Sequence, residues 1–283
     1  MGVKGMRKMT VFLTLVSWTV LTVYLMPFIW MIGTSFKPIG EWGEPHLIPR
    51  EPTLRNYREL VTGGIYGVRG HFPPITRYLI NSVITSTVVA LLTTLFGSMT
   101  AYAIQRYRVG GSTFASWILS LRMIPPVAIL LPLVIMTKFL GIYNTLIGLI
   151  FVYPVIALPI TTWFMIGSFK SIPRETDEAA LIDGCTELQV FYRIILPQSV
   201  TGLATAATFA FLFCWSEFLI PLLLAPSEST MPLTVFAAYF SNQYGILWGP
   251  LSSAAVVIAI PVIIIAVIIQ KYIVRGLTLG FIR

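Results

Sequence analysis

Two ionisable residues stand in otherwise charge-free apolar stretches of this chain. Arg122 interrupts the apolar residues 113–137, and Glu217 directly follows the charge-free run 194–216. A charged side chain near the centre of a bilayer costs at least about 2.5 kcal/mol, so each must face protein or water. Two interpretations stay open: a structural ion pair, between these residues or with a second subunit, and a polar path through the membrane.

Catalytic and metal-binding chemistry has little support in the sequence. His46 and His71 lie in one segment without carboxylate or cysteine clustering, so neither a zinc site nor a catalytic triad is indicated. Cys185 falls in a polar loop and Cys214 in an apolar stretch, which implies no disulfide framework. The phosphate-binding pattern G-x-x-x-x-G-K followed by Ser or Thr does not occur. We therefore expect no enzyme, no metal site and no cofactor in this chain.

Long apolar stretches must position these residues. Hydrophobic residues make up 56% of the 283-residue chain and charged residues 11%, whereas soluble domains carry about 25% charged residues. Since about 20 apolar residues cross a bilayer as a helix, the sequence predicts an all-α membrane protein with six transmembrane helices. The expected helices cover residues 10–32, 79–104, 113–137, 146–168, 201–224 and 251–273.

Basic residues indicate how these helices cross the membrane. With the N-terminus inside, eleven of the 19 Lys and Arg residues fall in inner segments. The eleven are Lys4, Arg7, Lys8, Arg106, Arg108, Lys170, Arg174, Arg193, Lys271, Arg275 and Arg283. The positive-inside rule then places both termini and the polar loop 169–199 in the cytoplasm. Because the net charge of +8 gathers at membrane boundaries, it indicates lipid and not nucleic acid as the partner.

The polar loop 169–199 has the local pattern of two helices joined by a turn. Pro173 suits a first helical turn, and the acidic residues after it suit the positive end of a helix dipole. Gly184 offers a left-handed stop. Thr186 and Gln189 have capping-box spacing, which predicts that a second helix starts directly after Thr186. An amphipathic loop lying along lipid headgroups would share the apolar side of this segment.

Small residues at set positions distinguish this loop from a headgroup-binding one. Glu178-Ala179-Ala180 is followed by Asp183-Gly184 and then by Leu196-Pro197, and the small side chains permit close approach by a partner. The order and spacing resemble the EAA loop, the cytoplasmic ATPase-contacting segment in permease subunits of ATP-binding-cassette (ABC) importers. The resemblance implies that the ATPase-coupling residues are Glu178, Ala179, Ala180, Asp183, Gly184, Leu196 and Pro197.

The resemblance covers nearly the whole chain and is closest to the carbohydrate-type permeases. The matching strings are Tyr78-Leu79-Ile80-Asn81-Ser82, Ala101-Tyr102-Ala103, Arg122-Met123-Ile124-Pro125-Pro126, Gly141-Ile142-Tyr143-Asn144-Thr145, Trp215-Ser216-Glu217-Phe218-Leu219 and Arg275-Gly276-Leu277-Thr278. They imply a type I importer (maltose-permease-like) transmembrane domain with both termini cytoplasmic. The expected regions are an N-terminal helix with an outer segment over 1–77, a five-helix core with the coupling loop over 78–273, and a cytoplasmic tail over 274–283.

Membership would also imply partners and a transport path. The expected partners are a second homologous permease, two ATPase subunits that bind ATP and Mg²⁺, and an extracytoplasmic solute-binding protein, assembled in the cytoplasmic membrane of a bacterium or archaeon. Candidate substrate-path residues are Asn81, Arg122, Trp215 and Glu217. Trp215 or Trp163 could stack on a sugar ring, whereas Asn81 could instead cap the start of its helix. Ser216 replaces an Asn that is frequent in the family.

Three alternatives remain open at the level of sequence. A glycerol-phosphate or polyol importer permease of the same superfamily is one of them: Arg122 would suit an anionic cargo such as glycerol phosphate, but one arginine does not separate it from a neutral sugar or polyol. A non-transporting membrane scaffold would not stimulate an ATPase. An intramembrane enzyme would need a nucleophile or metal constellation that the sequence does not contain.

Overall fold

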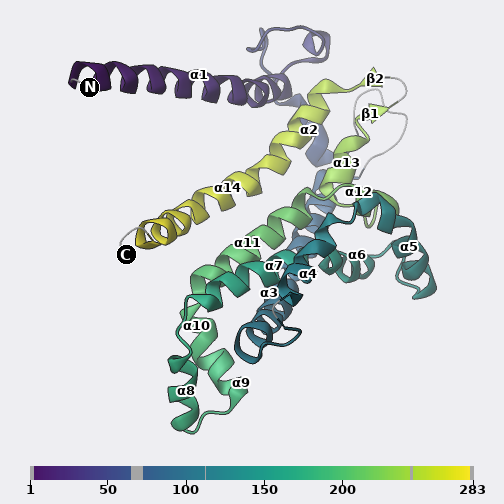
Figure 1. The fold of residues 1–283 in the computed structure, drawn as a ribbon. Coiled ribbons are helices and arrows are strands. Elements are labelled where there is room, and N and C mark those ends of the chain that lie inside the picture. The colour runs from purple at the N-terminus through teal and green to yellow at the C-terminus, as the bar shows by residue number, and fades with distance from the viewer. Residues whose placement is uncertain (1–2, 65–72, 112, 243–244, 281–283) are drawn as a thin grey trace. The chain divides into compact units, whose positions relative to one another are not determined.

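The computed structural model describes residues 3–64, 73–111, 113–242 and 245–280 (Figure 1). Helices dominate it, which confirms the all-α expectation apart from one small hairpin. In that hairpin β1 (Ser241–Asn242) pairs antiparallel with β2 (Gly245–Ile246). His71 lies outside the described residues.

Three helices are individually long and apolar enough to cross a membrane. They are α1 (Val3–Ser35), α3 (Ile75–Tyr107) and α14 (Trp248–Gly280). Three further pairs of helices pass the same test only when each bent pair counts as one crossing. Within the described residues the structure is therefore consistent with six crossings.

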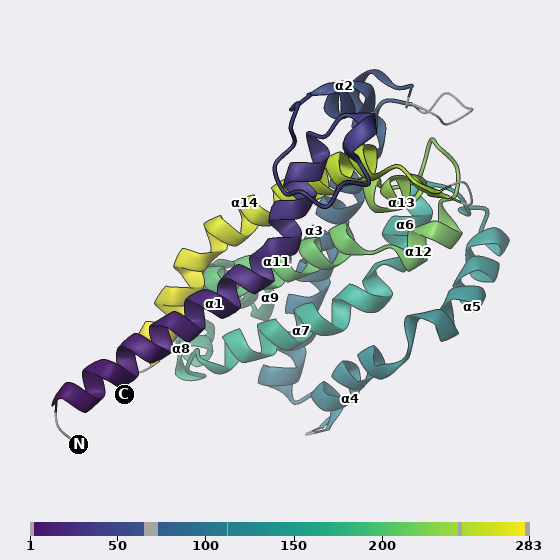
Figure 2. The same ribbon diagram turned by 90° about the horizontal axis from the view of Figure 1, so that it is seen from above.

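Bends interrupt the other expected spans, as the α4–α5 segment in Figure 2 illustrates. An angle of 91° separates the segment 114–123, formed by α4 (Phe114–Ser120) and η2 (Leu121–Met123), from α5 (Pro126–Phe139). The axes of α6 (Leu146–Val152) and α7 (Pro154–Lys170) differ by 44°. An 82° bend separates the segment 187–198 from α11 (Val200–Ser216), which is followed by α12 (Leu219–Leu224).

The helix expected over 201–224 is broken between Ser216 and Leu219, and Pro221 explains why. A proline ring clashes with the carbonyl four residues earlier and offers no N–H to it. Here that carbonyl belongs to Glu217, whose backbone is extended (ψ 133°). Its oxygen accepts a hydrogen bond from Thr234 Oγ1 at 2.9 Å instead. The breaks at Pro125-Pro126 and at Pro154 likewise divide the expected helices 113–137 and 146–168.

The chain divides into two compact units, of which the first comprises residues 1–75 and 237–260. This unit contains α1, η1 (Ile39–Glu41), α2 (Arg55–Thr62) and the start of α14. The Trp30 and Trp248 rings meet edge to face at 5.6 Å. Lys37 is fully buried, and its ammonium donates to the Glu44 carbonyl at 2.7 Å. A buried ammonium needs such an acceptor, so the segment after α1 is closely packed and not a loose loop.

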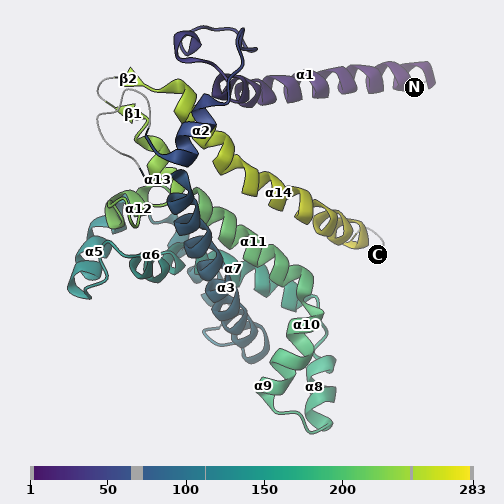
Figure 3. The ribbon, with the colours of Figure 1, turned by 180° about the vertical axis from the view of Figure 1, so that it is seen from behind.

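The second unit, residues 76–236 and 261–283, holds the packed helices α3, α7 and α11. The α7 and α11 ribbons run side by side in Figures 1 and 3. Small residues permit the close approach of these helices. Where α3 meets α7, a Cβ added at Gly97 of α3 would lie 2.6 Å from Thr161 Oγ1 of α7. One added at Gly202 of α11 would overlap the side chain of Ser168. Small residues at helix contacts are the usual basis of packing in membranes, where apolar burial alone gives little driving force.

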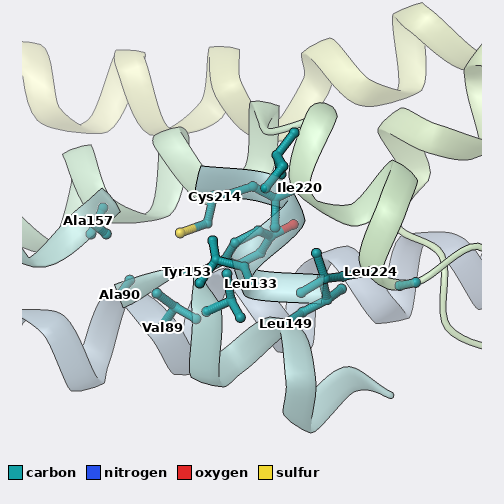
Figure 4. Close-up of a cluster of buried hydrophobic side chains, with 13 residues drawn as sticks. Val89, Ala90, Leu133, Leu149, Tyr153, Ala157, Cys214, Ile220 and Leu224 are labelled. Carbon is teal, nitrogen blue, oxygen red and sulfur yellow. The ribbon is translucent and has the colours of Figure 1, made fainter. Parts of the chain in front are cut away.

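A buried cluster around Tyr153 joins the broken helices of this unit (Figure 4). Tyr153 lies at the junction of α6 and α7 and has no exposed surface. The larger side chains around it come from five helices and include Val89, Leu133, Leu149, Cys214, Ile220 and Leu224. Because the cluster joins both halves of the α6–α7 and α11–α12 breaks, packing holds these bends in place.

Candidate functional site

The polar loop folds as the helix–turn–helix that its sequence predicts. α8 (Glu175–Ile182) ends at Asp183, and Gly184 follows with φ +85°, the left-handed conformation that glycine favours. The Thr186 hydroxyl accepts from the Gln189 N–H, and the Gln189 side chain accepts from the Thr186 N–H. This capping box starts α9 (Glu187–Val190) at the expected residue.

A wider turn follows α9, which the sequence pattern did not predict. Residues Phe191–Ile195 form a π-helix, in which the Leu196 N–H donates to the carbonyl of Phe191, five residues earlier. α10 (Leu196–Gln198) then contains Pro197. An α-helix would need an N–H at position 197 to reach the Arg193 carbonyl, and proline has none. The π turn accommodates this missing bond, and α10 ends at Gln198 with Ser199 as its C-cap.

The EAA-like residues divide into an inward and an outward set. Ala180 is 5% exposed and packs with Val190, Phe191 and Ile195, and Leu196 lies partly buried against the same cluster. The outward, exposed set is Glu178, Ala179, Asp183, Gly184 and Pro197. A Cβ added at Gly184 would meet no atom of this chain within 4 Å. The inward set therefore holds the two helices together, and the outward set is free to contact another molecule.

Apolar side chains surround the outward set. Ile182 is 86% exposed, Leu188 66% and Leu181 45%. In Figures 1 and 3, α8, α9 and α10 form one end of the second unit, away from α12. Exposed apolar side chains beside small residues are typical of an interaction surface.

Two arginines tie this loop to the end of α3. Arg106 Nε lies 2.5 Å from Asp177 Oδ2, and the same guanidinium donates to the Ile172 carbonyl at 3.1 Å. In the reverse direction, Arg174 of the loop donates to the Gln105 carbonyl at 2.8 Å. Burial raises the pKa of the Asp177 carboxyl above its ordinary value, although the Arg106 charge opposes this. The loop is thus fastened to a membrane helix by contacts outside the EAA pattern.

Asn81 does not cap a helix start, because α3 begins at Ile75 and Asn81 lies inside it. Its side chain is buried and donates to the carbonyls of Ser229 and Met231, at 3.1 and 3.0 Å. The neighbouring Ser82 hydroxyl accepts from the Leu233 N–H at 2.8 Å. α3 therefore holds the loop that precedes α13 (Leu233–Ala238).

Asn144 organises the other side of the same loop, a role that sequence reasoning missed. Its φ of +56° places it in the left-handed region, which Asn tolerates better than most residues. The side-chain oxygen accepts from the Ser227 N–H at 3.2 Å and from Thr230 Oγ1 at 2.7 Å. Its own N–H donates to the Leu224 carbonyl at 2.9 Å. The turn-forming string 141–145 was the available signal, but its partners lie more than 70 residues away.

Replacing Asn144 tests this network. Asn144→Ala removes the acceptor and forces a less tolerant residue to positive φ, so we expect the loop 225–232 to be destabilised by about 1–3 kcal/mol. Asn144→Asp keeps both the acceptor and the backbone preference and should preserve stability. The measurement is the rate of protease cleavage within the loop in the membrane-reconstituted protein. Equal cleavage rates for Ala and Asp would contradict the assignment.

Arg122 and Glu217 form no ion pair with each other within the described residues. The Arg122 guanidinium lies over the Phe213 ring, 4.3 Å from its centroid, and donates to the Ile156 carbonyl at 3.4 Å. Glu217 Oε1 instead accepts the N–H groups of Leu219 and Ile220, at 3.0 and 3.2 Å. Glu217 thereby satisfies the free N–H groups at the start of α12.

The two candidate stacking rings differ in accessibility. Trp215 is 2% exposed, and its ring lies nearly parallel to that of Phe211, with centroids 5.6 Å apart. Trp163 of α7 is 43% exposed. In this conformation Trp163 and not Trp215 presents an aromatic face to its surroundings.

Comparisons with known proteins agree with these features. The family described as binding-protein-dependent transport system inner membrane component matches residues 93–279. The chain is 34% identical over 263 residues to the trehalose/maltose transport system permease protein MalG of Thermococcus litoralis, covering 92% of each chain. It is 31% identical over 262 residues to the trehalose transport system permease protein SugB of Mycobacterium tuberculosis, again covering 92% of each.

A solved structure shares the fold. A chain of a bacterial ABC transporter involved in the import of the acidic polysaccharide alginate superposes with a TM-score of 0.79 at 19% identity, covering 96% of this chain and 99% of that one. This likeness extends over the bent spans as well as the long helices. With apolar helices for several crossings and the helix–turn–helix of α8 and α9, the chain belongs to the family of binding-protein-dependent transport system inner membrane components.

Proposed function

We propose that this chain is the permease subunit of a binding-protein-dependent ABC importer that carries a sugar or related carbohydrate across the cytoplasmic membrane. The observation that carries the proposal is the outward set: Glu178, Ala179, Asp183 and Gly184 are exposed on α8 and on the turn before the capped α9, and Pro197 is exposed on α10. The names of the relatives, which include transporters of trehalose, maltose and diacetylchitobiose, support a carbohydrate as cargo.

The proposed mechanism is alternating access driven by separate subunits. A soluble binding protein delivers the carbohydrate from outside to this permease and a second homologous one. Two ATPase subunits bind ATP and Mg²⁺, close, and displace the α8–α9 segments, so that the cavity between the permeases opens outward. This chain binds no nucleotide itself in the proposal. Its part is to convert movement at α8–α9 into movement of the helices that pack on Ala180 and Leu196.

The alternatives have weaker support. A glycerol-phosphate cargo would give Arg122 an anion to bind, but this side chain already contacts the Phe213 ring and the Ile156 carbonyl, and a polyol is neutral. The names of the relatives do not favour this cargo. A non-transporting scaffold predicts no stimulation of an ATPase, which the reconstitution below measures.

Reconstitution tests the proposal. The chain should co-purify with an ATPase and a second permease, and the complex in liposomes should hydrolyse ATP faster when its binding protein carries a carbohydrate. An excess of neutral sugars should inhibit uptake of the carbohydrate, whereas glycerol phosphate should not. Absence of any associated ATPase would refute the importer assignment, whereas competition by glycerol phosphate alone would refute the carbohydrate.

Substitutions at Glu217 separate a capping role from a charge-based one. Because Glu217 Oε1 accepts two N–H groups at the start of α12, Glu217→Ala should lower stability by about 0.5–2 kcal/mol, the usual cost of losing a cap. Glu217→Gln keeps an acceptor oxygen and should retain most of the uptake. The measurements are thermal unfolding in detergent and uptake in liposomes. A stable Glu217→Gln protein without uptake would show that the charge itself contacts the cargo.

A further inference from the structure

We propose that helix α3 relays the movement of α8–α9 to the opposite end of the second unit, through the Arg106–Asp177 ion pair at one end and the Asn81 and Ser82 hydrogen bonds at the other. The inference rests on the proposed function, because it takes α8–α9 as the segment that the ATPase moves. It assigns Arg106 and Asp177 a positioning role that the EAA pattern does not contain.

Neighbouring residues of α8 point in different directions. Glu178 is exposed and belongs to the outward set, whereas the side chain of Asp177, one residue earlier, is 12% exposed and faces Arg106. Successive helical residues lie about 100° apart around the axis, so one turn of α8 can contact a partner on one side and α3 on another. A displacement of Glu178 must therefore displace Asp177.

The junction between α8 and the end of α3 is shielded from water and held by several contacts. The Arg106 side chain is 8% exposed, so the pair is largely shielded from water. A shielded ion pair is screened far less by solvent than an exposed one, and separating its charges leaves both unsatisfied. The side-chain hydrogen bonds from Arg106 to the Ile172 carbonyl and from Arg174 to the Gln105 carbonyl cross the same junction in both directions. α8 and the end of α3 should consequently move as one body.

Helix α3 is continuous. It runs for 33 residues from Ile75 to Tyr107 without a proline, a length of about 50 Å at 1.5 Å per residue. The expected spans 113–137, 146–168 and 201–224 are each broken, whereas α3 has no break. An unbroken helix transmits a displacement along its whole length, whereas a bent pair can absorb it at the break.

The other end of α3 is bonded to the loop before α13 and to α13 itself. Asn81 holds the carbonyls of Ser229 and Met231, and Ser82 holds the Leu233 N–H. One turn earlier, the Tyr78 ring stacks on Phe236 with centroids 4.1 Å apart. Side-chain hydrogen bonds, a ring contact and a helix thus join the loop 225–232 and the start of α13 to the Arg106–Asp177 pair. This is a contiguous physical connection, whose coupling must be measured directly.

The test uses the assembled transporter in liposomes, with a cysteine reporter on the loop. In a Cys185→Ser background, Glu228→Cys places a thiol at an exposed loop position. The readout is the rate of labelling by a membrane-impermeant maleimide, without nucleotide and with ATP plus vanadate. In the parent, ATP should change this rate. Arg106→Gln and Asp177→Asn should each reduce the ATP effect by about tenfold, within the usual range for coupled sites.

A double variant, one control and one variant at the other end of α3 complete the test. Arg106→Gln combined with Asp177→Asn should be no worse than either single change, because both remove the same interaction, and it leaves no buried charge unpaired. Glu59→Gln, which removes the more exposed Arg55–Glu59 pair of α2, should leave the ATP effect intact. Asn81→Ala should reduce the ATP effect while the ATPase still co-purifies.

The labelling rates and the co-purification of the ATPase together decide between the relay and its alternatives. Variants that retain the ATPase but lose the labelling change support the relay. Variants with an undiminished ATP effect, or single effects that add in the double variant, overturn the relay and leave the importer assignment standing. A parent complex that binds no ATPase overturns both.

Discussion

Gly184→Asp is expected to abolish ATP-driven uptake while the protein still inserts and folds. A Cβ added at position 184 would meet no atom of this chain within 4 Å, so the substitution should not disturb the packing of α8 on α9. The new carboxylate would follow directly on the exposed Asp183, on the surface where we propose that the ATPase docks. The φ of +85° adds strain of about 1–3 kcal/mol for a residue with a side chain. Uptake in liposomes and co-purification of the ATPase are the measurements.

Two comparisons separate docking from backbone strain. Gly184→Asn tolerates the left-handed conformation and carries no charge, so uptake that is lost with Asn as well identifies close approach as the requirement. Gly111 also has positive φ, +75°, and open space around its Cβ position, but lies outside the coupling segment. Gly111→Asp should therefore leave uptake largely intact. Normal uptake by Gly184→Asp would refute the docking role.

Gly202→Val is expected to destabilise the packing of α11 on α7 strongly. A Cβ at position 202 would overlap both Oγ and Cβ of Ser168, where α11 and α7 run side by side. Overpacking of this kind costs about 1–3 kcal/mol, and the β-branched valine adds bulk at the closest point. The apparent melting temperature in detergent should fall, and less protein should survive purification.

The partner residue supplies the control for this prediction. Ser168→Gly removes the two atoms that the new Cβ would meet, so the combination of Gly202→Ala with Ser168→Gly should be more stable than Gly202→Ala alone. The interaction energy from the four melting curves measures the α7–α11 contact directly. Additive effects of the two substitutions would show that the helices do not meet there.

Local chemistry in the sequence predicted the helix–turn–helix well. The capping box of Thr186 and Gln189 and the left-handed Gly184 act over only a few residues, so the pattern contains all the interacting groups. The apolar stretches likewise predicted the long helices, because about 20 apolar residues satisfy their own backbone only as a helix in lipid. The family resemblance, read from residue spacing, is confirmed by the match over residues 93–279.

The breaks in the spans could not be derived in the same way. A proline in a membrane helix permits a kink or a full break, and the difference depends on whether another group satisfies the freed carbonyl. At Glu217 that group is the Thr234 hydroxyl, 17 residues later. The π-helix over Phe191–Ile195 similarly depends on how the segment packs as it approaches Pro197.

The sequence alone determined the membrane class, the approximate spans and the ATPase-coupling hypothesis, since these depend on composition and on contacts between near neighbours. Only the tertiary structure decided that Glu217 caps α12, that Asn81 holds a loop some 150 residues away and that Arg106 pairs with Asp177. Long-range pairings depend on how helices meet in three dimensions. Hydrophobic periodicity and turn chemistry do not specify which helices pack against each other.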